Sequence, residues 1–82
     1  MRLDKYLKVS RLIKRRTVAN EACDGGRVTV NGKVARASYD VKVGDVIALH
    51  FGGRVLAVEV LNVSETAGKS EASLLYREVN AQ

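Results

Sequence analysis

The spacing of apolar residues changes once along this chain, and the change limits the folds available to it. The first segment has residues at steps of three and four, which would line one face of an α-helix: Leu3, Tyr6, Leu7, Ser10 and Ile13. From Arg27 onward, apolar and polar residues alternate, which is the period of a β-strand with one buried face. We therefore expect helices first and a sheet after them.

A second short helix is expected after the basic junction Lys14-Arg15-Arg16. Thr17 is a suitable N-cap, because its hydroxyl can accept a hydrogen bond from a backbone N–H of the first turn. Ala19 and Cys23 would share the apolar face of this helix. Gly25-Gly26 would end it, since glycine readily adopts the left-handed conformation found at helix C-termini.

Two glycine-containing turns predict two β-hairpins. Asn31-Gly32 separates two short alternating runs, and Gly52-Gly53 separates residues 46–51 from residues 54–63. Tightly connected strands pair antiparallel, so the sheet should be small, twisted and antiparallel. The expected fold class is α+β, with two N-terminal helices packed on this sheet.

The C-terminal third is expected to divide into a link and a helix. Residues 64–70 contain Gly68 and no large apolar side chain, which predicts a flexible link between a domain at 1–63 and a C-terminal segment at 71–82. Apolar residues in that segment follow a helical spacing, so we expect a short C-terminal helix: Ala72, Leu75, Tyr76 and Val79.

Composition excludes several classes of protein. The chain of 82 residues has room for one domain, and its single cysteine and single histidine supply neither a disulfide nor a zinc site. No run approaches the ~20 apolar residues of a membrane span, and charges near the N-terminus oppose a signal peptide. We expect a cytoplasmic, monomeric protein without metal, cofactor or membrane partner.

Basic charge is concentrated in the N-terminal half. Residues 1–36 carry ten basic and three acidic residues, a net charge of +7, whereas the remainder carries −2. Such asymmetry indicates a polyanionic partner, and one helix face plus a basic loop suits structured RNA. Tyr6 lies on the apolar stripe, which favours core packing over base stacking. The candidate RNA-binding residues are Arg2, Lys5, Lys8, Arg11, Lys14, Arg15, Arg16, Arg27 and Lys33.

Residues that could support catalysis are few, so we do not expect an enzyme. His50 lies within a strand run without a neighbouring nucleophile, and Cys23 lies on an apolar helix face. Asp40 and Asp45 are explained better by turns than by acid-base chemistry. The paired glycines lack the spacing of a phosphate-binding loop.

Five short motifs, in this order and spacing, resemble the RNA-binding domain named after ribosomal protein S4. They are Arg2-Leu3-Asp4, Arg16-Thr17, Ala19, Gly26-Arg27-Val28 and Val30-Asn31-Gly32. The resemblance covers residues 1 to about 50, and Val43-Gly44-Asp45-Val46 agrees with it as well. It implies two helices packed on a small twisted sheet, with the helices and a hairpin presenting the RNA-binding surface.

Within that superfamily, the chain resembles the small bacterial factors of ribosome-associated quality control and, more distantly, heat shock protein 15. The resemblance rests on the residues 1–7, 13–19 and 20–23. It implies binding to large ribosomal subunits obstructed by peptidyl-tRNA, contacts with ribosomal RNA and tRNA, and stabilisation of the P-site tRNA. It also implies a partner factor that adds a C-terminal tail to the stalled chain.

The resemblance also implies roles for individual residues. Arg2, Lys5, Lys8, Arg11, Arg15 and Arg16 would contact phosphates, with Arg16 as the anchor. Asp4 has two interpretations, a partner of the helix dipole or an acceptor that orients a neighbouring arginine. Arg27 and Lys33 extend the surface or are ordinary strand-end charges.

Two other functions fit the same sequence features, and a third is excluded. The chain could be a general ribosomal-RNA-binding protein, or a detached subunit of an RNA-modifying enzyme. Val30-Asn31-Gly32 followed by Val43-Gly44-Asp45-Val46 also resembles the ubiquitin-like sulfur carriers, but those need a C-terminal Gly-Gly, and this sequence ends in Ala81-Gln82.

Overall fold

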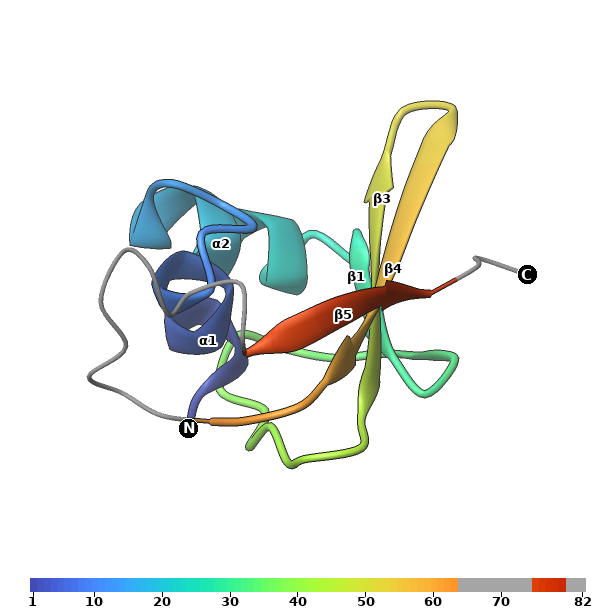
Figure 1. Ribbon diagram of the computed structural model, residues 1–82. Coiled ribbons are helices and arrows are strands. Elements are labelled where there is room, and N and C mark those ends of the chain that lie inside the picture. The colour runs from blue at the N-terminus through green and yellow to red at the C-terminus, as the bar shows by residue number, and fades with distance from the viewer. Residues whose placement is uncertain (64–74, 80–82) are drawn as a thin grey trace.

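Two helices cover one face of a five-stranded antiparallel sheet (Figure 1). The structure, a computed structural model, describes residues 1–63 and 75–79. The helices are α1 (Leu3–Val9) and α2 (Arg16–Asp24). The strands, in the sheet order β2-β1-β3-β4-β5, are β1 (Val28–Val30), β2 (Lys33–Val34), β3 (Val46–Phe51), β4 (Arg54–Val60) and β5 (Tyr76–Val79). The expected α+β class is confirmed.

The apolar stripe of the first segment forms part of the core, as expected. Helix α1 is shorter than the stripe, because the chain leaves the helix at Ser10 and Arg11 takes a left-handed conformation with φ of 65°. The whole stripe is nevertheless buried: Leu3, Tyr6, Leu7, Ser10 and Ile13. Helix and following turn therefore bury one continuous apolar face.

Helix α2 begins two residues earlier than the sequence predicted, because its N-cap is residue 15 and not residue 17. Arg15 is the N-cap, with extended backbone and no hydrogen bond from its side chain, and Thr17 lies inside the first turn. The prediction of Thr17 as N-cap is therefore wrong. Arg16, the first helical residue, directs its guanidinium toward Asp4 of α1, and this long-range contact accompanies the earlier start. The predicted end is confirmed, since Gly25 is the C-cap and Gly26 has a φ of +80°.

Both predicted hairpins are present. Asn31 and Gly32 both have positive φ, as a tight two-residue turn with the right twist requires, and they join β1 to β2. The second hairpin joins β3 to β4 with Phe51 opposite Arg54. Alternate residues of these strands face the helices and are buried: Val28, Val30, Ile47, Leu49, Val58 and Val60. The core thus lies between this sheet face and the two helices.

The predicted C-terminal helix is wrong where the structure describes it. Tyr76–Val79 is strand β5, which pairs with the free edge of β4 so that Tyr76 lies opposite Val60. Just before it, the carbonyl of buried Leu75 accepts hydrogen bonds from the Tyr6 hydroxyl at 2.6 Å and the Leu61 N–H at 2.8 Å. Backbone hydrogen bonds to the edge of β4 therefore determine the conformation of this segment, although its apolar residues have a helical spacing. The predicted link at 64–70, residues 71–74 and residues 80–82 lie outside the described residues.

Within residues 1–63 and 75–79, no helix combines the length and apolar character that crossing a membrane requires.

Candidate nucleic-acid interface

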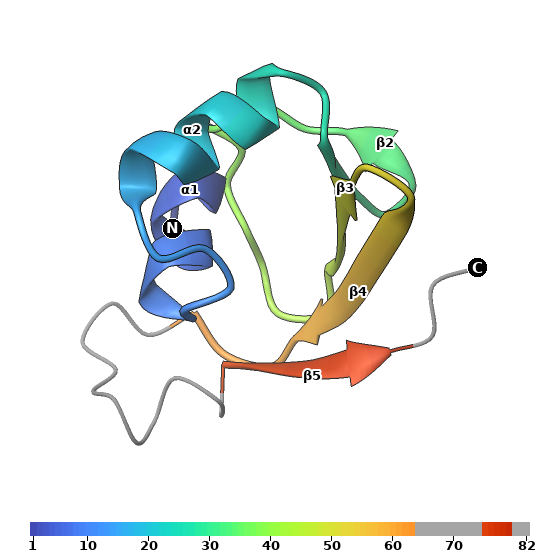
Figure 2. The same ribbon diagram turned by 90° about the horizontal axis from the view of Figure 1, so that it is seen from above.

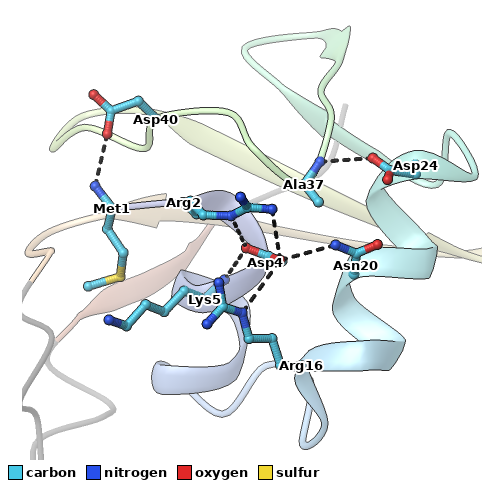
Figure 3. Close-up of polar contacts among 9 residues, drawn as sticks. All are labelled: Met1, Arg2, Asp4, Lys5, Arg16, Asn20, Asp24, Ala37 and Asp40. Carbon is cyan, nitrogen blue, oxygen red and sulfur yellow. Dashed lines mark hydrogen bonds and ion pairs between the residues drawn. The ribbon is translucent and has the colours of Figure 1, made fainter.

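Asp4 connects the start of α1 to α2 (Figure 3). Its carboxylate is almost fully buried, with 2% of the residue exposed, and accepts hydrogen bonds from both sides. Arg2 Nε lies 3.2 Å from Oδ1, Arg16 Nε lies 3.5 Å from Oδ2, and Asn20 Nδ2 lies 3.2 Å from Oδ2. The backbone N–H of Lys5 donates to Oδ1 at 2.8 Å. A single carboxylate therefore holds two arginines from different segments on one side of the helix pair.

These contacts bear on the two interpretations of Asp4. The bond from the Lys5 N–H belongs to the first turn of α1, where a carboxylate interacts favourably with the helix dipole. The bonds from Arg2 and Arg16 are those expected of an acceptor that orients arginine side chains. The geometry contains both sets of contacts.

The carboxyl of Asp4 is held in its charged form. Burial on its own would raise the pKa, but hydrogen bonds from Arg2, Asn20 and the Lys5 N–H, together with the charge of Arg16, lower the pKa below the ordinary 3.8. A lowered pKa means that the folded state favours the ionised carboxylate more than the unfolded state does. The resulting stabilisation is present above the pKa of the unfolded chain and is lost as pH falls through the folded-state pKa.

We expect Asp4→Asn to lower the free energy of unfolding at neutral pH, because asparagine has no negative charge to pair with the two arginines and replaces one accepting oxygen by an NH₂ donor. The difference from the native chain should shrink as pH falls below 3.8, where Asp4 itself becomes protonated. Urea denaturation of both proteins at several pH values measures the difference in unfolding free energy. If the difference in unfolding free energy between the two proteins stays constant down to pH values well below 3.8, the charged role of Asp4 is contradicted.

Arg2 and Arg16 remain available for a ligand. Their side chains are 51% and 48% exposed, although each uses its Nε to contact Asp4. A guanidinium has five N–H donors, so several donors of each arginine are left to face solvent. Planar guanidinium groups match phosphate oxygens geometrically, and their attachment to Asp4 reduces the entropy that binding would cost. The pair is thus prepared to contact an anion.

A groove of about 380 Å³ adjoins this pair along α2. It is lined by Asp4, Arg16, Thr17, Asn20 and Glu21. Thr17, which the sequence predicted as the N-cap, lies in the first turn of α2 and contributes to the groove wall. Asn20 was absent from the sequence-based candidates, although its position one helical turn after Arg16 could have indicated that both side chains reach the same carboxylate.

The remaining candidates lie on several elements. Eight of the nine predicted basic residues are exposed, and Lys5 is partly buried. Lys8 lies in the last turn of α1, and Arg11, Lys14 and Arg15 lie on or next to the α1–α2 connection. Arg27 follows the end of α2, and Lys33 lies in edge strand β2. Among the described residues, the side chains of Arg2 and Arg16 share the carboxylate of Asp4, and the other candidates are distributed over α1, the α1–α2 connection, the end of α2 and strand β2.

The structure supports the structural interpretation of Cys23 and Asp45. Burial raises the pKa of the Cys23 thiol to about 11, with further contributions from the charges of Asp4 and Asp24, so the thiol stays protonated. Asp45 accepts hydrogen bonds within a turn, as expected, from the Lys42 N–H, the Asn31 amide and the Tyr39 hydroxyl. Among the described residues, no group of three or more His, Cys, Asp or Glu is arranged to hold a metal ion.

Comparison with known proteins adds evidence from three directions. The model of the S4 domain family matches residues 1–47. The chain is 60% identical to the RQC P-site tRNA stabilizing factor of Halalkalibacterium halodurans over 76 residues, covering 93% of this chain and 86% of the relative. It is 53% identical to the Bacillus subtilis protein of the same name, covering 93% of this chain and 88% of the relative.

A solved structure resembles the fold closely. The trimeric structure of Vibrio cholerae heat shock protein 15 superposes with a TM-score of 0.87 at 36% sequence identity, covering 96% of this chain and 81% of that protein. A second structure, of hypothetical protein HP1423, has a TM-score of 0.82 at 32% identity and covers each chain completely. The arrangement of two helices on a five-stranded sheet is thus shared with solved proteins.

Proposed function

The chain belongs to the S4-domain family of RQC P-site tRNA stabilizing factors, and from that membership we propose that it acts by binding RNA on obstructed large ribosomal subunits. RQC stands for ribosome-associated quality control. The proposed partners are the RNA of the large subunit and the peptidyl-tRNA trapped on it. Because both proposed partners are parts of ribosomal complexes, the proposed place of action is the bacterial cytoplasm.

The observation that carries the proposal is the pair of arginines attached to Asp4. Arg2 and Arg16 come from different segments, yet both approach one buried carboxylate and keep about half of each side chain exposed. Arg16 is also the first residue of α2, where the free N–H groups of the first turn favour a phosphate. Two fixed guanidinium groups and a helix start can therefore contact neighbouring phosphates of structured RNA without reading its bases.

We propose that binding itself is the action. A binding protein shifts an equilibrium between two states only by its different affinity for them. Contacts with ribosomal RNA and tRNA at once would favour the state in which the tRNA occupies the P site, while a separate factor extends the stalled chain. A monomer is sufficient for this role, although the Vibrio relative is described as trimeric; sedimentation velocity of the purified protein decides between these states.

Replacing the Arg16 side chain tests the proposal most directly. Arg16→Ala should weaken binding to large subunits by about 1–3 kcal/mol, the range for hydrogen bonds to charged groups. The thermal midpoint should change little, because Asp4 keeps its bonds from Arg2, Asn20 and the Lys5 N–H. Co-sedimentation with purified subunits measures the affinity, and calorimetry measures the midpoint.

The matched control for this variant is Arg54→Ala. Arg54 is exposed at the β3–β4 hairpin, and its replacement removes the same single charge. We expect Arg54→Ala to bind almost as well as the native chain. Equal affinity of the Arg16 and Arg54 variants would contradict a specific role for Arg16.

A further inference from the structure

A second, larger groove lies away from Asp4, at the β1–β2 hairpin. Its volume is about 640 Å³, which is within the range of about 300–1,000 Å³ of small-molecule sites. In Figure 2, the chain after β2 crosses to the helices and passes along them before it enters β3. The groove is formed where this crossing segment meets the hairpin, by Val30, Asn31, Lys33, Val34, Ala35, Arg36, Ser38 and Tyr39.

The charge of this groove differs from that of the first one. Lys33 and Arg36 are exposed, and none of the described residues that line the groove is acidic. The first groove instead contains the carboxylates of Asp4 and Glu21 beside a single arginine. The charge of its lining therefore makes the second groove more favourable for an anionic ligand than the first.

Tyr39 is the aromatic residue of the second groove, and several hydrogen bonds fix its position. Its hydroxyl donates to Asp45 Oδ2 at 3.1 Å, its N–H donates to the Arg36 carbonyl at 3.0 Å, and its carbonyl accepts from the Leu3 N–H at 2.8 Å. The side chain is partly buried and packs against the core. A ring held in place loses little conformational entropy when a flat group stacks on it.

We propose that this groove binds an unpaired nucleotide of an RNA strand, with the base stacked on Tyr39 and the phosphates at Lys33 and Arg36. The proposal rests on the proposed function in taking RNA as the partner, and it adds a second contact of a different kind. Aromatic rings stack on any base, while neighbouring cations neutralise the backbone, which is the usual combination for single-stranded RNA. Paired RNA keeps its bases stacked internally and cannot use Tyr39 in this way.

The test compares two RNAs and two substitutions at the same position. The full chain is titrated with a labelled single-stranded RNA oligonucleotide and with a blunt RNA duplex. Tyr39→Leu should weaken binding of the single strand about tenfold, equal to about 1.4 kcal/mol, and leave duplex binding within about twofold. Tyr39→Phe keeps the ring and should bind the single strand nearly as well as the native chain.

A pair of exposed cations provides a second test that does not alter the core contacts. Lys33→Ala combined with Arg36→Ala should weaken single-strand binding more than Lys42→Ala combined with Arg54→Ala, which removes the same charge from exposed positions elsewhere. If circular dichroism shows that Tyr39→Leu does not fold, the comparison of the two double variants becomes the test of the nucleotide site. Equal losses in the two double variants would then overturn the proposal.

Three results with folded proteins would also overturn it: no binding of the single strand by the native chain, no effect of Tyr39→Leu, or an equal loss in Tyr39→Phe and Tyr39→Leu. The last result would mean that the hydroxyl bond to Asp45 matters, and not the ring. Subunit binding by Arg16→Ala reports on the proposed function separately. If Tyr39→Leu loses single-strand binding while Arg16→Ala keeps its affinity for large subunits, the nucleotide site is supported and the role of Arg16 in the proposed function is contradicted.

Discussion

A fourfold increase in salt concentration should weaken binding to isolated large ribosomal subunits by about two to four orders of magnitude. This expectation assumes that about five to seven phosphates are neutralised, each contributing a slope of about −0.7 to −0.9 in log affinity against log salt. The basis is the excess of ten basic over three acidic residues in the first 36 positions, most of the basic side chains being exposed. Co-sedimentation at several salt concentrations gives the slope.

Single substitutions show which residues contribute to the slope of log affinity against log salt concentration. Arg2→Ala and Arg16→Ala should each reduce its magnitude by about one contact, whereas Arg54→Ala should leave it unchanged. A slope near zero for the native chain would exclude binding through phosphates. An unchanged slope in both arginine variants would place the phosphate contacts at the other exposed basic residues instead.

Local patterns predicted most of the fold. The helical spacing of Leu3, Tyr6 and Leu7 and the turn residues Asn31-Gly32 depend on interactions between near neighbours, so both could be deduced from the sequence. The strand at Tyr76–Val79 could not be deduced in this way. Its conformation depends on the free edge of β4 and on the bonds that the Leu75 carbonyl accepts from Tyr6 and Leu61.

The candidate site was predicted in part for the same reason. Charge clustering and the family resemblance identified Arg2 and Arg16 as RNA-binding candidates, and the structure joins them through Asp4. Neither the clustering nor the resemblance identified Asn20, which reaches the same carboxylate from the next turn of α2. Tyr39 lies in an irregular segment without periodicity, so only the folded chain places it beside Lys33 and Arg36 in one groove.

The protein should bind large subunits that carry peptidyl-tRNA more tightly than empty large subunits. A preference of about 100-fold corresponds to about 2.7 kcal/mol, which the additional contacts with the tRNA would have to supply. The physical reason is that stabilising the tRNA-bound state requires a difference in affinity between the two states. Pelleting assays with both kinds of subunit, at the same physiological salt concentration, measure this preference.

The phosphate contacts with ribosomal RNA exist on both kinds of subunit, so they cannot produce the preference by themselves. Arg54→Ala should keep both affinities, and Arg16→Ala shows whether its contact belongs to the ribosomal RNA or to the tRNA. A loss that is equal on both kinds of subunit assigns Arg16 to the ribosomal RNA, whereas a loss confined to tRNA-carrying subunits assigns it to the tRNA. If the native chain occupies the two kinds of subunit equally, the role in stabilising P-site tRNA is contradicted. The chain would then be a general ribosome-binding protein.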